Sequence, residues 1–476
     1  MLFTYCWNVV YLYSIKLSYA NFITTNFKEL EMAKITFMGA GSTVFAKNVL
    51  GDCMCREALQ DSHIALYDID PVRLKESKAM LEILNQNINS GRAKITAHLG
   101  EKNRRAALRD ADFVVNAIQV GGYDPSTIID FEIPKKYGLR QTIADTLGIG
   151  GIFRALRTIP VMWDFAHDME EVCPDAWFLN YTNPMSMLTG AMLRYTGVKT
   201  VGLCHSVQVC SKSLLDTLGM EYEADQLRDH IAGINHMGWL LEIKRNGKDI
   251  YPEIKRTAAK KLKEWRKQGA EKSGNMIRLS LMQHFGYYMT ESSEHNAEYS
   301  PYWIKSQYPE LIEEFNIPLD EYPRRCINQI ADWNKRSHEL VANPTLDHKM
   351  SHEYGSAIMS AVVTNKPIQI GGNVLNNGLI SNLPSNSVVE VPCLVDSNGV
   401  QGCYVGELPT QCAALNMTHI NVHLLAIEAA YTRKKDAIYH AAMLDPHTSS
   451  ELKLDDIRKM CDELIDAHGD MLPEYH

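Results

Sequence analysis

The sequence lacks a long uninterrupted apolar run, an excess of basic residues and an ordered cysteine framework. Its first 20 residues are apolar but interrupted, with no positive charge ahead of them, so they resemble neither a membrane span nor a signal peptide. A formal net charge of -9 excludes the basic surface that binds a phosphate backbone. Eleven cysteines, an odd number scattered along the chain, favour free thiols. We therefore expect a cytoplasmic protein with no membrane or nucleic-acid partner.

Length and composition are those of an ordinary globular protein. The chain has 476 residues, 45% of them hydrophobic and 22% charged, without low-complexity tracts or obvious repeats. Because β-prone sequence begins at Ala33, directly after Met32, we interpret residues 1–31 as an extension outside the fold. We expect two domains beyond it, over residues 32–205 and 206–476.

A glycine-rich turn follows the first β-prone run. Residues 35–38 read ITFM and lead into GAGSTVF, in which Gly39 and Gly41 permit a tight turn and a close approach to a pyrophosphate. Ser42 and Thr43 begin the predicted helix, whose free amide groups would face that anion. Val44 occupies the place of the usual third glycine, which is a departure from the dinucleotide pattern.

Two further apolar runs extend the same pattern. Residues 64–67 end at Asp68, 27 residues after Gly41, where a carboxylate can accept hydrogen bonds from a ribose. Residues 113–117 form a third run. Strand, glycine turn, helix, strand and acid in this order predict parallel β-α-β units and a Rossmann-like dinucleotide site. A Rossmann-like fold without a ligand is the alternative.

Polar side chains follow two later strand-like runs. Asn183 follows the run at 177–181, and Cys204 with His205 follows the run at 200–203. Ligands of open α/β sheets bind at the carboxyl ends of strands, so these residues are candidates for ligand contact. Asn183 could equally cap the next helix, and Cys204 could be a small buried apolar residue.

A second polar pair, Asn235-His236, stands between apolar runs. A thiolate and an imidazole together suit a divalent transition metal, with substrate oxygens completing an open site. Cys204 and His236 are therefore the candidate metal ligands.

The motifs GAGSTVF, LYDID, YTNP, GLCHSVQ, GINHMGW and NNGLISNLPSNSVVEVPC together resemble those of glycoside hydrolase family 4, and the CHSV form is similar to that of its α-galactosidases. This resemblance implies an NAD-dependent reaction in place of the usual two-carboxylate hydrolysis. It implies an α/β fold, with a lactate/malate dehydrogenase-like amino-terminal domain and a mixed α+β carboxyl-terminal domain. It also implies NAD⁺ and Mn²⁺ as cofactors, small α-galactosides such as melibiose as substrates, and a homodimer or homotetramer.

Residue roles follow from the same resemblance. It implies oxidation at carbon 3 of the sugar, elimination, water addition and re-reduction. The dinucleotide would be held by Gly39, Gly41, Ser42, Thr43 and Asp68. Cys204 and His236 would bind the metal. Asn183 would contact the sugar, and His205 would donate a proton to the leaving group. His205 could instead orient a ligand without donating a proton.

The base that removes the proton from carbon 2 is not identified by one motif. The region that resembles the family's base-bearing segment is 285–299, which is dense in ionisable groups. Tyr299, Glu294 and His295 are the candidates, and each could instead bind substrate or face solvent.

The carboxyl-terminal half carries fewer signals. Residues 366–392 predict strands and turns, and residues 410–430 predict a helix in which His419 and His423 lie four apart. We interpret these two histidines as packing residues, because no third metal ligand lies nearby in the sequence.

Three alternative functions stay open at this point. An α-glucosidase or α-glucuronidase of the same family would share all these motifs. A lactate/malate-type dehydrogenase would need no Cys204–His236 metal site. A dinucleotide-sensing protein with a degenerate site would bind NAD⁺ without turnover.

We expect the change Asp68→Ala to weaken NAD⁺ binding while metal binding persists, because the carboxylate would accept hydrogen bonds from the ribose and not from the metal ligands. Titration of the purified protein with NAD⁺ measures this effect. An unchanged affinity would place the ribose contact elsewhere.

Overall fold

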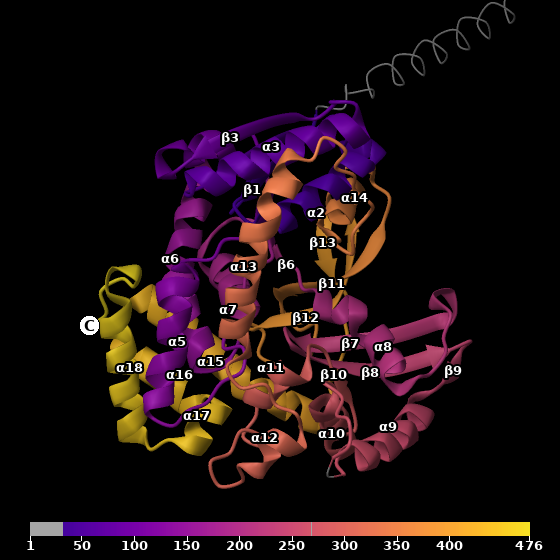
Figure 1. Ribbon diagram of the computed structural model, residues 1–476, viewed down its shortest axis with the longest axis vertical. Coiled ribbons are helices and arrows are strands. Elements are labelled where there is room, and N and C mark those ends of the chain that lie inside the picture. Colours follow the sequence, from indigo (N-terminus) through magenta and orange to yellow (C-terminus); the bar gives the residue numbers. More distant parts are fainter. Residues whose placement is uncertain (1–31, 268) are drawn as a thin grey trace, which may run out of the picture.

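The computed structural model describes residues 32–476 except residue 268 (Figure 1). The interpretation of residues 1–31 as an extension lies outside this range. One sheet of 13 strands runs through the molecule, with helices packed around it. Within the described residues, no helix combines the length and apolar character needed to cross a membrane.

The amino-terminal half contributes six parallel strands in the order β3-β2-β1-β4-β5-β6. Their bounds are β1 (Lys34–Met38), β2 (His63–Asp68), β3 (Lys94–Leu99), β4 (Phe113–Asn116), β5 (Trp177–Asn180) and β6 (Lys199–Gly202). This order is that of the dinucleotide-binding Rossmann sheet, with its crevice where the order reverses between β1 and β4. The predicted Rossmann-like domain is confirmed.

Helices connect these strands. They are α2 (Thr43–Cys55), α3 (Pro71–Asn89), α4 (Arg104–Leu108), α5 (Ile128–Lys136), α6 (Gly148–Val172) and α7 (Met185–Tyr195), with short turns η1 (Glu57–Leu59), η2 (Glu101–Asn103) and η3 (Gly122–Thr127). The start of α3 illustrates the local sequence control: Pro71 occupies the first turn, and the Asp70 carboxylate accepts hydrogen bonds from the N–H groups of Val72 and Arg73.

The carboxyl-terminal half extends the same sheet with antiparallel strands. These are β7 (Leu227–Ile234), β8 (Met237–Arg245), β9 (Lys248–Asp249), β10 (Tyr288–Met289), β11 (Ile368–Leu375), β12 (Val388–Asp396) and β13 (Gly399–Gly402). Strand β11 joins the two halves, because Asn373 pairs with Gly202 of β6. The sheet then continues as β12-β7-β8-β10, so the mixed α+β prediction for this half is confirmed.

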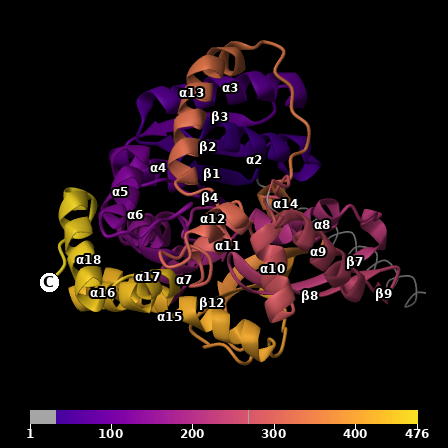
Figure 2. The same cartoon turned by 60° about the horizontal axis from the view of Figure 1, so that its bottom comes forward.

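The helices of this half lie partly against the amino-terminal half. They are α8 (His205–Leu218), α9 (Tyr251–Trp265), α10 (Met276–Phe285), α11 (Ser293–Glu298), α12 (Glu310–Glu314), α13 (Glu321–Ala342), α14 (Gly355–Thr364), α15 (Thr410–Thr432), α16 (Lys435–Leu444), α17 (Pro446–Glu451) and α18 (Leu454–His468), with turns η4 (Ala224–Gln226) and η5 (Gly469–Met471). Helix α13 packs on α3, and α15 packs on α6 and α7 (Figure 2). His419 and His423 of α15 are both buried.

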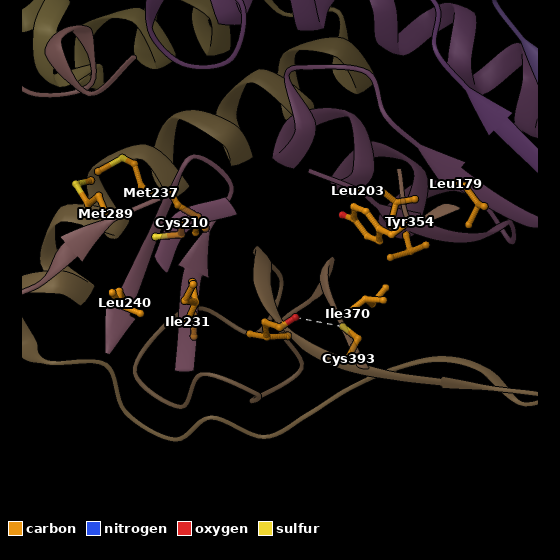
Figure 3. Packing of buried hydrophobic residues seen from close by; sticks show 14 of the residues in the cluster. Leu179, Leu203, Cys210, Ile231, Met237, Leu240, Met289, Tyr354, Ile370 and Cys393 are labelled. Atoms are coloured by element: carbon orange, nitrogen blue, oxygen red, sulfur yellow. Dashed lines mark hydrogen bonds between the residues drawn. The ribbon is translucent and has the colours of Figure 1, made fainter. Parts of the chain in front are cut away.

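The larger hydrophobic core spans both halves. Figure 3 shows part of it, where Leu203 and Tyr354 lie above Ile370 of β11 and Cys393 of β12, and Ile231 of β7 lies farther to the left. The expected boundary between residues 205 and 206 stays a prediction, since sheet and core continue across it.

A buried ion pair fixes helices α5, α6 and α18 to one another. The Arg157 guanidinium donates to both oxygens of Asp130, at 3.2 and 2.7 Å, and Nε2 of His468 lies 3.0 Å from Asp130 Oδ1. All three side chains are buried. Removing one member of such a set leaves an uncompensated buried charge.

We expect Asp130→Ala to lower the free energy of unfolding by roughly 3–5 kcal/mol, because Arg157 loses its counter-charge inside the protein. The urea midpoint of unfolding measures this effect. Glu82→Ala, which breaks the exposed Lys78–Glu82 pair, is the control and should cost less than about 1 kcal/mol. Equal losses in the two variants would contradict the assigned role of Asp130.

Candidate active site

A cavity of about 400 Å³ lies where the carboxyl ends of β1, β4, β5 and β6 meet the β7–β8 turn and the segment after β10. Parallel strands end at the same edge of a sheet, so residues that follow them converge there. Predicted site residues that line the cavity are Ser42, Asn183, Cys204, His205, His236 and His295. Segments far apart in the sequence therefore form one site.

The glycine turn after β1 requires glycine at Gly39 and leaves little space for a side chain at Gly41. Gly39 has φ of +86°, and a Cβ there would lie 2.7 Å from the carbonyl oxygen of Ala117. The Gly41 N–H donates to Asp68 Oδ2 at 2.6 Å, and a Cβ on Gly41 would lie 2.8 Å from that oxygen. Asp68 therefore lies directly against the turn. Its partly exposed carboxylate can also accept hydrogen bonds from the hydroxyl groups of a ribose.

Ser42 and Thr43 differ in what they can offer a ligand. Ser42 is the exposed N-cap residue of α2 and lines the cavity. Thr43 is buried, and its hydroxyl donates to the Gly41 carbonyl at 3.3 Å and accepts from Ser77 Oγ at 3.0 Å. Thr43 can therefore meet a phosphate only through its backbone N–H at the helix start. Val44 is 52% exposed, so the missing third glycine causes no clash.

Three potential metal ligands meet at the other side of the cavity. Donor atoms of Cys204, His236 and Glu291 all lie within 4.8 Å of one another, which holds for no other group of three or more His, Cys, Asp or Glu in the described residues. Cys204 is the N-cap of α8, His236 lies in the β7–β8 turn, and Glu291 follows β10. The sequence indicated the first two. Glu291 was missed, although it lies in the ionisable segment 285–299.

The chemistry of these three donors fits a transition-metal dication. Sulfur, nitrogen and oxygen donors together suit borderline cations such as Mn²⁺ or Zn²⁺. Burial lowers the pKa of His236, so its ring is neutral, the form that ligates metals. Burial, with Glu390 and Glu291 nearby, raises the pKa of the Cys204 thiol. The thiolate therefore needs an adjacent cation.

Tyr299 lies behind His236 and does not line the cavity. Its hydroxyl is 3.0 Å from His236 Nδ1, and its carbonyl oxygen is 2.7 Å from Nε2 of the buried His419. With Nδ1 engaged, His236 presents Nε2 toward Glu291, whose Oε2 is 3.4 Å away. Burial raises the pKa of Tyr299 well above its usual range. This position favours orientation of the metal ligand over proton abstraction from a sugar.

The other two base candidates sit in one turn of α11 but point to different surroundings. Glu294 forms an ion pair with Arg325 of α13 and does not line the cavity. His295 does, with Nδ1 2.7 Å from Ser292 Oγ and Nε2 3.7 Å from Asp145 Oδ1. Burial opposes its charge, but the carboxylates of Asp145 and Glu291 raise the pKa of His295 to about 9.

Besides Glu291, two further charged side chains of the cavity were not indicated by the sequence. Asp145, in the segment before α6, and Arg154, inside α6, both line it. Arg154 donates through Nε to the Asn183 carbonyl at 3.2 Å. Neither residue lies in a recognisable motif. The one sequence signal for each was a charged residue within an otherwise apolar stretch.

Asn183 is placed for both roles that its sequence allowed. Its Oδ1 accepts from the Met185 N–H at 3.2 Å at the start of α7. Asn183 also lines the cavity. Its side-chain NH₂ group has no hydrogen bond within the described part of the chain. One end of the amide therefore caps the helix while the other can meet a ligand.

His205 borders the cavity next to Cys204. Its Nε2 is 2.7 Å from Glu353 Oε2, and the hydrogen bond to that carboxylate raises the pKa of His205. The next residue, Tyr354, accepts a hydrogen bond from the Cys204 N–H through its hydroxyl at 2.7 Å. A segment of the carboxyl-terminal half thus contacts both residues of the Cys-His pair.

Fold and cavity together define a Rossmann-type enzyme in which a nucleotide-binding edge and a three-donor metal-type cluster share one site. The family model described as "Family 4 glycosyl hydrolase" matches residues 34–220, and "Family 4 glycosyl hydrolase C-terminal domain" matches residues 231–448. The chain belongs to the family 4 glycosyl hydrolases, as the motifs indicated.

Individual relatives agree with this assignment. The chain is 63% identical over 444 residues to an alpha-galactosidase of Bacillus subtilis (strain 168), covering 93% of this chain and 100% of the relative. Among solved structures, lplD from Bacillus subtilis is similar with a TM-score of 0.81 and 25% identity, covering 91% of this chain and 100% of that one. A 6-phospho-alpha-glucosidase from gut microorganisms, in complex with NAD and Mn²⁺, has the same fold with a TM-score of 0.76 at 20% identity, covering 94% and 100%.

We expect Glu291→Gln to weaken binding of Mn²⁺ by more than about tenfold, because loss of an outer-shell partner alone costs on the order of 10- to 100-fold. Calorimetric titration of the chelator-treated protein with Mn²⁺ measures this effect. Glu294→Gln, three residues away and paired with Arg325, is the matched control and should bind Mn²⁺ like the parent. Similar affinities in both variants would remove Glu291 from the ligand set.

Proposed function

We propose that this protein is an α-galactosidase that hydrolyses small α-galactosides such as melibiose with NAD⁺ and Mn²⁺ as cofactors. The observation that carries the proposal is that residues from the glycine turn and from the metal-type cluster, Ser42, Cys204 and His236, line one cavity. The choice of sugar is supported by the 63% identity to the Bacillus subtilis alpha-galactosidase over its full length.

Cofactor binding is assigned to residues at two sides of this cavity. Gly39 and Gly41 let the backbone approach the pyrophosphate, and Asp68 orients the ribose. Cys204, His236 and Glu291 hold the Mn²⁺ ion. When bound, NAD⁺ accepts and returns the hydride of carbon 3, while Mn²⁺ polarises the oxygens on carbons 2 and 3. The 6-phospho-alpha-glucosidase that contains both cofactors supports this pair.

The protein's own side chains handle the sugar and its protons. The free NH₂ of Asn183 donates to a sugar hydroxyl. His205 gives a proton to the glycosidic oxygen as the leaving group departs, which a sugar leaving group requires. Its position beside Cys204 brings this proton close to the metal-held end of the sugar.

Removal of the proton from carbon 2 is assigned to His295 in its neutral form. Asp145 and Glu291 raise the pKa of His295 to about 9, so this role requires that a cation held by the neighbouring Glu291 lower that pKa again. Of the three candidates, His295 is the one that lines the cavity, whereas Glu294 pairs with Arg325 and Tyr299 lies behind His236. Ser292 and Asp145 hold the His295 ring in place.

Location and assembly belong to the same proposal. We propose a reducing cytoplasmic location, which is supported by the ten cysteines of the described residues, all of them free. A homodimer or homotetramer is proposed from the resemblance to the family.

The test is hydrolysis of paired 4-nitrophenyl α-galactoside and α-glucoside under reducing conditions. The protein is first stripped of cofactor and metal, and NAD⁺ and Mn²⁺ are then added separately and together. We expect α-galactoside cleavage only when both are present, because hydride transfer and polarisation are both needed.

Three other outcomes would contradict the proposal in different ways. Cleavage without NAD⁺ would exclude the redox mechanism. Faster cleavage of the α-glucoside would change the substrate class. Stoichiometric accumulation of NADH with an alcohol, and no hydrolysis, would favour a dehydrogenase.

A further inference from the structure

A largely buried carboxylate lies against the candidate proton donor. Glu353 Oε2 is 2.7 Å from His205 Nε2, and the Glu353 side chain is only 10% exposed whereas the His205 side chain is 45% exposed toward the cavity. The imidazole is also near the rings of Tyr181 and Tyr354, with centroids 6.2 and 6.4 Å away. The outer face of His205 is therefore open to a ligand, while its far nitrogen is held by the protein.

The segment that carries Glu353 is fixed to the cofactor-side helix α2. This segment, residues 343–354, runs from α13 to α14, which packs beside α2 (Figure 2). The buried Asp52 of α2 accepts from the Ser351 N–H at 2.8 Å and the Ser351 hydroxyl at 2.6 Å, and His348 Nε2 lies 2.6 Å from its Oδ1. Asp52 thus anchors the segment through two residues.

The anchor extends directly to Glu353 and beyond it. Ser351 Oγ accepts a hydrogen bond from the Glu353 N–H at 3.1 Å. On the other side, the Tyr354 hydroxyl accepts from the Cys204 N–H and lies 3.1 Å from the Cys204 carbonyl. The Glu353 N–H and the Tyr354 side chain are therefore both held, and these contacts fix the position of the Glu353 carboxylate relative to His205.

This contact determines which nitrogen of His205 can meet a substrate. Nε2 is engaged by Glu353, while Nδ1 has no protein hydrogen bond within the described part of the chain. We propose that Glu353 is the positioning residue of His205: it accepts a hydrogen bond from Nε2–H and so presents Nδ1–H to the glycosidic oxygen. This proposal rests on the proposed function, in which His205 is the proton donor.

The proton transfer balances within the proposed reaction. As the bond between carbon 1 and the glycosidic oxygen breaks, its electron pair stays on that oxygen, which takes the proton from Nδ1. His205 is left with its Nε2 proton, still bound to Glu353. The water that adds to carbon 1 in the return half supplies a proton back to Nδ1, so the enzyme is restored.

The experiment compares leaving groups that differ in their need for a proton. Three variants are prepared with NAD⁺ and Mn²⁺ bound: Glu353→Ala, Glu353→Gln and the surface control Glu82→Gln. Their kcat and KM are measured on melibiose and on 4-nitrophenyl α-galactoside. A nitrophenolate leaves without protonation, whereas the glucose of melibiose does not.

We expect Glu353→Ala to lower kcat on melibiose by on the order of 10²-fold, the loss typical of a misplaced catalytic group. The nitrophenyl substrate should lose less than about threefold in kcat, since it needs no proton. Glu353→Gln should recover much of the melibiose activity, because its amide oxygen can still accept from Nε2–H. Mn²⁺ and NAD⁺ affinities, measured by calorimetry, should match those of Glu82→Gln.

Two outcomes would overturn the proposal. Equal losses on both substrates, with weakened cofactor binding, would mean that Glu353 only supports the fold around Cys204. Unchanged melibiose hydrolysis in Glu353→Ala would mean that His205 needs no partner. Failure of the proposed function itself is recognised separately, because the unmodified protein would then cleave neither galactoside.

Discussion

The convergence of six parallel strands at one edge of the sheet is the constraint on which the site depends. The glycine turn follows β1, Asn183 follows β5 and Cys204 follows β6, so backbone geometry alone brings them to one cavity. Strand β11 then pairs with β6 and attaches the antiparallel strands, which carry His236 to the same edge. A nucleotide edge and a metal-type cluster become neighbours because one sheet spans both halves.

Burial of ionisable groups around this edge has to be compensated by specific partners. His236 is held by Tyr299, which is held by His419, and His295 lies between Asp145 and Ser292. These supports come from the two ends of α11, from α15 and from the segment before α6. The cavity residues are therefore kept in place by contacts behind them, as active-site geometry requires.

The segment between α13 and α14 shows how the two halves support each other. It is anchored on α2 through Asp52, yet it delivers Glu353 and Tyr354 to the Cys204–His205 pair. The helix that begins at the glycine turn thus also fixes the surroundings of the metal-side residues. The glycine-turn helix and the Cys204–His205 pair are therefore connected through one segment.

The sequence alone determined the elements whose signals are local. Gly39, Gly41 and Asp68 stand at spacings that indicate a β-α-β turn, and Cys204 and His236 follow apolar runs. Only the tertiary structure showed which groups Glu291 and Glu353 contact, because their partners lie tens to hundreds of residues away. It also separated the three base candidates of one segment, since a short helix turns neighbouring side chains toward different surroundings and periodicity cannot say which of them faces a cavity.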